Sequence, residues 1–167
     1  SIMPDGNTIL VSLNFNDKIK SGYYVSNKTL TGWGKPVKLN ISNFENYIGR
    51  AWGGGCLSNS GKALILYISV SSDPKDYFCN IYVSLKNDNG SWSEPKMLDY
   101  PVNVKVGTQG SFSSFLASDE KTLYFASDRN GGYGSCDIYY SKRLDDTWLN
   151  WSDLVNLGPT INSSDWE

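Results

Sequence analysis

Not one of the 167 residues in this chain is histidine. Histidine is the commonest general base and metal ligand in proteins, so Ser-His-Asp catalysis, Cys-His catalysis and imidazole-based zinc sites are excluded within this sequence. Cysteine is scarce too, since Cys56, Cys79 and Cys136 form no CxxC pair. Cys79 and Cys136 fall at the same position of two successive repeats, too far apart for a disulfide, which needs Cα atoms within about 7 Å. We therefore predict that these cysteines are small buried apolar side chains.

Charge is also sparse and unpatterned. Charged residues make up 19 % of the chain, the net charge is −2, and Lys and Arg are scattered singly. A nucleic-acid binder usually carries a basic stripe, so no nucleic-acid partner is predicted. No apolar run approaches the roughly 18–20 residues that span a bilayer, so no membrane span is predicted. No segment sustains an apolar period of 3.6 residues, so no helices are expected.

Aromatic residues and glycine are plentiful, and they recur at a fixed spacing. The chain has 11 Tyr, 6 Trp and 16 Gly, a composition that favours sheets and tight turns. A constant step of 59 residues separates Trp33, Trp92 and Trp151, and the same step separates the leucines at 39, 98 and 157. Self-similarity of this kind indicates three repeats of a solenoid or propeller, with kelch-type propeller repeats near this length. We place their boundaries at about 1–49, 50–109 and 110–167.

Each repeat contains four strand signals. A polar turn leads into an aliphatic run, a tyrosine-bearing run follows, and a tryptophan strand comes last. Pro36 and Pro95 lie in the tryptophan strands, and proline cannot donate to a central ladder, so these are edge strands. A strand of small residues precedes the turn at 49–57 and 110–116, but in the first repeat only 1–3 remains. The predicted fold is all-β, with three four-stranded antiparallel β-propeller blades. A pair of stacked sandwiches is the alternative, although it would not require a constant step.

The third repeat reads SDEKTLYFASDRNGGYGSCDIY over 118–139 and WSDLVNLGPTINSSDWE over 151–167. It resembles the TolB-type, WD-repeat-like β-propeller repeat of bacterial envelope proteins, which is often found upstream of OmpA-like peptidoglycan-binding domains. The resemblance weakens toward the N-terminus, where Gly22 and Asn80 stand in place of Asp137. It implies a propeller, a periplasmic, outer-membrane-associated or extracellular location, and a binding role without catalysis.

Three blades do not close a ring, because propellers have typically 4–8. We therefore expect either a piece of a longer propeller protein or a homodimer in which two copies pair into a six-bladed ring.

Candidate binding residues lie in loops predicted to share one face of the ring. Aromatic rings with a few polar groups at such a mouth are typical of small-molecule or glycan sites. The candidates are Phe44, Tyr47, Arg50, Trp52, Asp73, Tyr77, Gln109, Asp128, Arg129 and Tyr133. Alternatively, Asp128 and Asp137 cap a turn with backbone hydrogen bonds, and Trp52 packs between blades.

The predicted function is a non-catalytic binding or scaffold module for a protein, peptidoglycan or glycan partner. The alternative is a propeller-fold glycoside hydrolase whose two carboxylates lie in further blades, since the small-residue strands carry no Asp or Glu. A calcium site among Asp73, Asp76, Asp128 and Asp137 lacks EF-hand spacing, so no metal or cofactor is predicted. Two further expectations concern single residues: the tryptophans at 33, 92 and 151 are mostly buried, and substitution of Arg129 or Tyr133 leaves folding intact.

Overall fold

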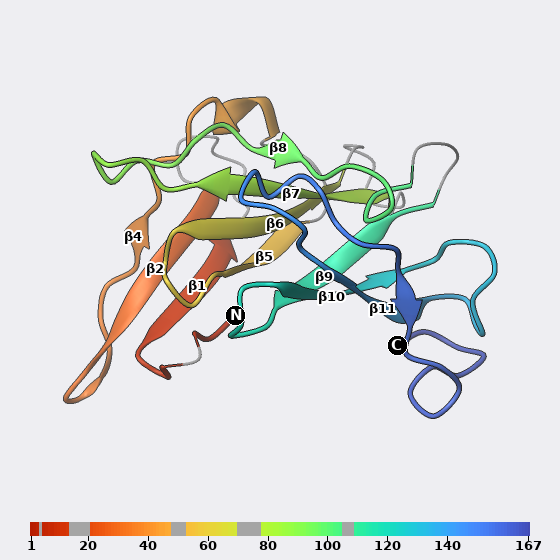
Figure 1. Ribbon diagram of the computed structural model, residues 1–167. Helices are drawn as coiled ribbons and strands as arrows, with labels where there is room; N and C mark the ends of the chain where they lie inside the picture. Colours follow the sequence, from red (N-terminus) through yellow and green to blue (C-terminus); the bar gives the residue numbers. More distant parts are fainter. Residues whose placement is uncertain (4, 14–20, 48–52, 70–77, 105–108) are drawn as a thin grey trace.

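The computed structural model describes residues 1–3, 5–13, 21–47, 53–69, 78–104 and 109–167. These residues form three four-stranded antiparallel sheets, and no α-helix occurs among them (Figure 1). The predicted all-β class with four antiparallel strands in each sheet is therefore confirmed. The same residues contain no helix long and apolar enough to cross a membrane.

The first sheet is the least regular of the three. Strand β1 (Thr8–Leu13) pairs with β2 (Gly22–Thr29), and β2 also pairs with two short segments, β3 (Gly32–Trp33) and β4 (Val37–Lys38). Pro36 lies between β3 and β4, where the edge ladder is interrupted, as expected for a residue without a backbone N–H. The strand of small residues is represented only by an isolated bridge from Ile2 to Ile9.

The second and third sheets repeat one complete pattern. The second has the order β5-β6-β7-β8, and the third has β9-β10-β11-β12. Isolated bridges from Lys86 to Trp92 and from Arg143 to Trp151 extend the edge of each sheet. The strands are β5 (Gly53–Leu57), β6 (Ala63–Ser69), β7 (Cys79–Leu85), β8 (Lys96–Met97), β9 (Ser111–Leu116), β10 (Thr122–Ser127), β11 (Asp137–Lys142) and β12 (Val155–Asn156).

The turns that lead into β1, β6 and β10 are equivalent. Each is closed by a backbone hydrogen bond of 2.8 Å. The N–H of Met3 donates to the carbonyl of Thr8, that of Ser58 to Ala63, and that of Ala117 to Thr122. Among the described residues, each turn contains one with positive φ: Gly6 at 67°, Gly61 at 69° and Glu120 at 55°. Glycine adopts this conformation without steric cost, which explains two of the three positions.

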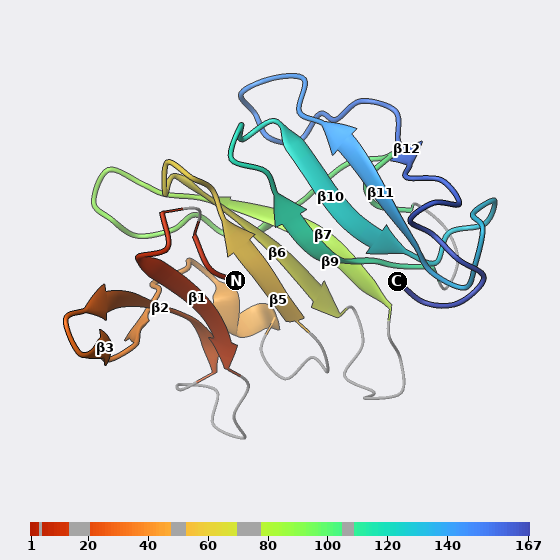
Figure 2. The same cartoon turned by 90° about the horizontal axis from the view of Figure 1, so that it is seen from below.

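The sheets lie side by side, and two hydrophobic cores fill the joints between them (Figure 2). Side chains alternate between the faces of a strand, so β6 contributes to both cores. Leu64 and Leu66 pack toward Leu10 and Tyr23 of the first sheet, whereas Ile65 packs toward the third sheet. Strand β5 lies against β1, and β9 lies against β5, β6 and β7.

The predicted burial of the repeated tryptophans is wrong for the first of them. Trp92 and Trp151 are 3 % and 4 % exposed, but Trp33 is 43 % exposed. The reason is where each tryptophan lies relative to the neighbouring sheet. Trp92 belongs to the core shared with the first sheet, where it bridges to Ile41, and Trp151 belongs to the core shared with the second. Trp33 is on the outer side of the first sheet, where no other described sheet covers it.

All three cysteines are buried and none forms a disulfide. The Cys56 Sγ accepts a hydrogen bond of 3.1 Å from the backbone N–H of Leu116 across the joint between the second and third sheets. Burial raises the pKa of Cys56 to about 11 and that of Cys136 to about 12. These thiols therefore act as small core side chains, as the sequence predicts.

Candidate binding site

The strands β1, β6 and β10 end on the same side of the molecule (Figure 2). This is the face on which the sequence predicts a binding site. Four of the ten candidates, Arg50, Trp52, Asp73 and Tyr77, lie outside the described residues. The other six are described, and they lie in separate places.

Phe44 and Tyr47 form the ends of a short 3-10 helix, η1 (Phe44–Tyr47), and pack between the first and second sheets. Phe44 meets Tyr23 edge to face at a centroid distance of 5.4 Å and stacks on Tyr47 at 6.0 Å, and Tyr47 meets Tyr82 at 5.7 Å. The Tyr47 hydroxyl also donates to the Pro95 carbonyl at 3.3 Å. Both rings are half-buried, and their main contacts join the two sheets.

Arg129 joins the third sheet to the second. Its guanidinium donates to the carbonyl oxygens of Pro101 and Val102, each at 2.8 Å. Further bonds of 3.0 Å reach the hydroxyls of Ser111 and Ser127. The same group lies over the rings of Phe125 and Tyr139, 5.4 and 5.1 Å from their centroids. Most donors of the side chain are therefore used within the protein, so these contacts favour a structural role for Arg129 and predict that its substitution weakens the fold.

Two carboxylates shape the loop after β10. Asp128 accepts a hydrogen bond of 2.7 Å from the Gly110 N–H. Asp137 is 1 % exposed and accepts bonds from the N–H groups of Tyr133 at 2.6 Å and Gly134 at 3.1 Å. A Cβ on Gly132 would lie 2.1 Å from an Asp137 carboxylate oxygen, so the loop fits around this group only with glycine there. The turn-capping interpretation matches the contacts of Asp137, whereas Asp128 binds the segment that leads into β9.

Tyr133 and Gln109 remain available for contacts outside the protein. The Tyr133 side chain is 55 % exposed, although its backbone is fixed by Asp137. Gln109 is half-buried at the start of the segment that leads into β9. Among the described residues, neither side chain has a contact that joins one sheet to another, and the hydrogen bond of Asp128 also stays within the third sheet.

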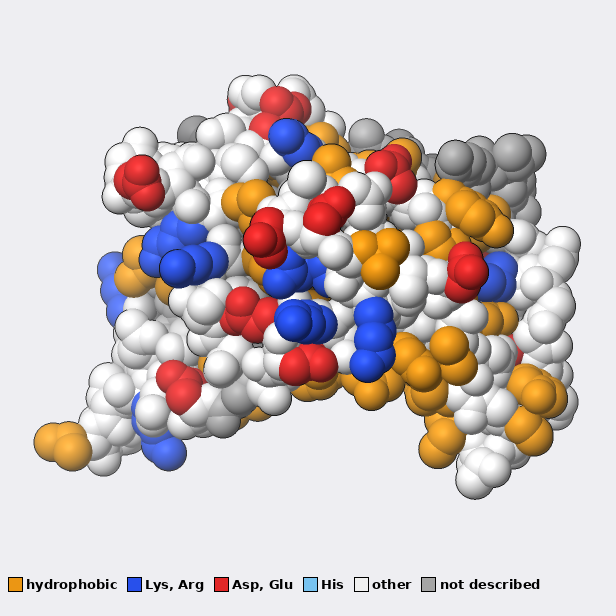
Figure 3. Space-filling model, viewed as in Figure 1, with side chains coloured by type: hydrophobic (Ala, Val, Ile, Leu, Met, Phe, Trp, Pro, Cys, Tyr) orange, Lys and Arg blue, Asp and Glu red, His pale blue; other side chains and the backbone are white. Residues whose placement is uncertain are grey.

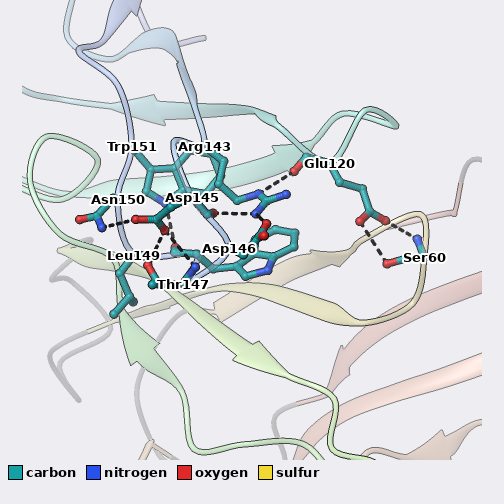
Figure 4. Close-up of polar contacts among 10 residues, drawn as sticks. Ser60, Glu120, Arg143, Asp145, Asp146, Thr147, Leu149, Asn150 and Trp151 are labelled. Atoms are coloured by element: carbon teal, nitrogen blue, oxygen red, sulfur yellow. Dashed lines mark hydrogen bonds and ion pairs between the residues drawn. The ribbon is translucent and has the colours of Figure 1, made fainter.

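A polar cluster at the opposite end of the third sheet is also structural (Figure 4). Arg143 lies over the Trp148 ring at 4.3 Å, donates to the Glu120 carbonyl at 3.1 Å, and pairs with Asp146 at 2.9 Å. The Glu120 carboxylate reaches the second sheet, where it accepts hydrogen bonds from the backbone N–H and the hydroxyl of Ser60. Trp148 is 8 % exposed and belongs to the core, so this cluster closes the joint from the outside.

A pocket of 310 Å³ opens where β1, β5 and β9 come together. Figure 2 shows these three strands side by side with the N-terminus near them, and the molecule is hollowed on this lower side in Figure 3. Its lining consists of Ser1, Leu10, Ser12, Gly54, Gly55, Tyr67, Ser113 and Ser114. The sequence-based prediction missed this site, although small residues are concentrated at 53–55 and 110–114 of the sequence.

Small residues give the pocket its polar walls. A Cβ on Gly54 would lie 2.3 Å from the Tyr67 hydroxyl, so glycine is needed where the tyrosine crosses β5. The Tyr67 hydroxyl is hydrogen-bonded to Ser113, and burial raises the pKa of this phenol, which therefore stays neutral at physiological pH. The Ser12 hydroxyl donates to the Gly53 carbonyl at 3.2 Å.

Ser113 and Ser114 lie at an irregularity of the third sheet. The register between β9 and β10 shifts between Tyr124 and Ala126, and Ser113 has a positive φ of 50°. Such a bulge re-aims side chains at a sheet edge. The Ser114 Oγ is buried and has no hydrogen-bond partner among the described residues. A buried hydroxyl without a partner costs free energy, so this atom points to a ligand or a water in the pocket.

The lining determines what the pocket can do chemically. It contains hydroxyls and backbone groups but no carboxylate, thiol or imidazole, so its side chains supply no general base at neutral pH. No group of three or more potential metal ligands occurs in the described part of the chain. The pocket therefore offers hydrogen-bond donors and acceptors without charged side chains.

Similarity to a known protein does not help to interpret this site. A scan against family models, a search of curated proteins and a search of solved structures each found no match to this chain.

Proposed function

We propose that the chain is a non-catalytic binding module built from β-propeller blades, and that the pocket between β1, β5 and β9 is its ligand site. The observation that carries the proposal is the buried Ser114 Oγ, which has no partner among the described residues, in a wall of hydroxyl and backbone groups with one apolar side chain, Leu10. A ligand hydroxyl would supply the missing partner.

The lining favours a neutral ligand that carries several hydroxyl groups. Serine and tyrosine hydroxyls both donate and accept, which suits the same dual character in a sugar. A volume of 310 Å³ is near the lower end of the range for small-molecule sites, which favours one or two sugar units. A glycan or peptidoglycan sugar in the bacterial envelope is thus the proposed partner, and the envelope location rests on the TolB-type resemblance alone.

The hydrolase alternative gains no support from this pocket. Glycoside hydrolysis needs two carboxyl groups about 5–10 Å apart, and no Asp or Glu lines the described site. Asp128, which follows β10, and Asp137, which begins β11, are engaged by backbone N–H groups. A protein that binds the loop after β10 is a second candidate partner, because the ring of Tyr133 in this loop is exposed.

Saturation-transfer NMR and calorimetry with chitobiose and maltose test the proposal. Ser114→Ala should weaken binding about two- to tenfold, the loss of one neutral hydrogen bond, without lowering stability, because this hydroxyl has no partner in the described protein. Ser118→Ala, in the exposed turn before β10, is the matched control and should bind like wild type. Failure of both sugars to bind, or equal affinity of the two variants, would count against the pocket.

A further inference from the structure

The third sheet has an apolar face that no described sheet covers. In the joint between the second and third sheets, the second sheet buries a set of apolar residues comprising Cys56, Ile65, Ile81, Val83, Leu98 and Val102. The residues at the same repeat positions of the third sheet are Phe115, Tyr124, Ile138, Tyr140, Leu157 and Ile161. Phe115 is 50 % exposed and Ile161 is 53 % exposed. We call this set the trailing face; hydrophobic side chains are visible at this end of the molecule in Figure 3.

The first sheet is uncovered on its opposite side. In the joint between the first and second sheets, the second sheet contributes Leu57, Leu64, Leu66, Tyr82 and Trp92. The equivalent residues of the first sheet are Ile2, Ile9, Val11, Tyr24 and Trp33. Ile2 is 57 % exposed and Trp33 is 43 % exposed, while the other three are half-buried. We call this set the leading face.

The two open faces are of complementary types. Inside the molecule, a trailing-type face packs on a leading-type face twice, once in each joint, and both times it forms a core of buried residues. The chain therefore exposes one trailing face and one leading face, and pairs of these two kinds of face already form both interfaces inside the molecule. Apolar patches of this kind mark interaction surfaces.

We propose that the trailing face of the third sheet binds the leading face of a second copy of this chain. Two copies joined head to tail through two such contacts close a ring of six blades, which is within the 4–8 known for propellers. This inference rests on the proposed propeller arrangement. In a closed ring, strands β1, β5 and β9 of the second copy would also lie across the central axis from the pocket between the same strands of the first copy.

Light scattering on the purified chain gives the first test. The expected mass is twice the 18.6 kDa of one chain. A monomer at every concentration up to the solubility limit would overturn the proposal. Species that keep growing with concentration would also overturn it, because they would show an open chain of copies in place of a closed ring.

Charged substitutions test which faces meet. Trp92 bridges to Ile41, which follows the edge strand of the preceding sheet, and Pro159 is two repeat steps of 59 residues after Ile41. Trp33 should therefore lie opposite the turn at 158–161 of the second copy, which contains Ile161. Ile161→Lys alone and Trp33→Glu alone should each give monomers. Both positions are exposed within one chain, so circular dichroism and thermal melting should remain close to wild type. Leu30→Glu, at a fully exposed hairpin tip, is the matched control and should leave the dimer intact.

Mixing the two monomeric variants separates head-to-tail pairing from the alternatives. An equimolar mixture of Ile161→Lys and Trp33→Glu retains one unchanged contact and places Lys opposite Glu in the other, so dimers should reappear. If Trp33→Glu alone stays dimeric, two trailing faces meet and the inference is wrong. The pocket lies within one chain, so a wild-type chain that binds the sugar but stays monomeric would overturn this inference and leave the proposed function standing.

Discussion

The guanidinium of Arg129 donates a hydrogen bond of 2.8 Å to the carbonyl oxygen of Val102. Arg129 follows β10 of the third sheet, whereas Val102 follows the edge strand of the second and is completely buried. A side chain in a glycine-rich surface loop thus fixes the angle between two sheets. Its position in the loop is typical of a ligand-binding cation, but its contacts are those of a structural clamp.

Arg129→Ala should destabilise the protein by about 3 kcal/mol, because it leaves the carbonyl oxygens of Pro101 and Val102 without their charged donor. Urea denaturation followed by tryptophan fluorescence measures the change. Lys121→Ala, an exposed cation in the turn before β10, should change stability by less than about 0.5 kcal/mol. Equal midpoints for the two variants would show that the clamp contributes nothing.

The buried carboxylate of Asp137 leads to a second prediction. Asp137→Asn keeps the shape but replaces one acceptor oxygen with an N–H₂ group, next to the N–H groups of Tyr133 and Gly134 and the amide of Asn156. We expect a loss of about 2–3 kcal/mol, the cost of buried groups left unpaired. Asp153→Asn, on the exposed edge, is the control. Unchanged thermal stability of Asp137→Asn would mean that the loop does not depend on this carboxylate.

The sequence predicted local features well because they depend on nearby residues. The polar turns, the aliphatic runs and the edge prolines each determine structure within a few residues, and the sheets formed accordingly. Trp33 was predicted wrongly because burial depends on a neighbouring sheet, and a repeat spacing does not tell whether that neighbour is present.

Other features were missed because they depend on backbone acceptors. The clamp of Arg129 ends on carbonyl groups, which every residue has and no side-chain pattern reveals. Asn103 and Asn162 were overlooked although they recur at the step of 59 residues. Asn103 bonds both the N–H and the carbonyl of Ile81, and Asn162 does the same for Ile138. The pocket depends on a bulge at Ser113, which no local pattern predicted.

The two kinds of tryptophan environment predict unequal mutational effects. Trp92→Ala should cost about 3–5 kcal/mol, as large aromatic truncations in a core do, because this ring is 3 % exposed. Trp33→Ala should cost less than about 1 kcal/mol in the monomeric Ile161→Lys background, where no second copy covers it. Denaturant titrations of both variants in that background measure the difference. Comparable losses at the two positions would mean that Trp33 is buried within a single chain.

The buried thiol of Cys56 predicts how stability depends on pH. Burial raises its pKa from 9.0 in the unfolded chain to about 11 in the fold, so the folded state favours the neutral thiol. Its contribution to stability is then fully present below pH 9 and is lost as the pH rises through about 11. Lysine and tyrosine side chains titrate in the same range, so the comparison must be made with Cys56→Ala. The difference in the free energy of unfolding between wild type and this variant should fall between pH 8 and 11, while a thiol-reactive dye should label Cys56 only after unfolding. A difference that stays constant over this range, or rapid labelling of Cys56 in the folded protein, would show that the joint between the second and third sheets admits solvent.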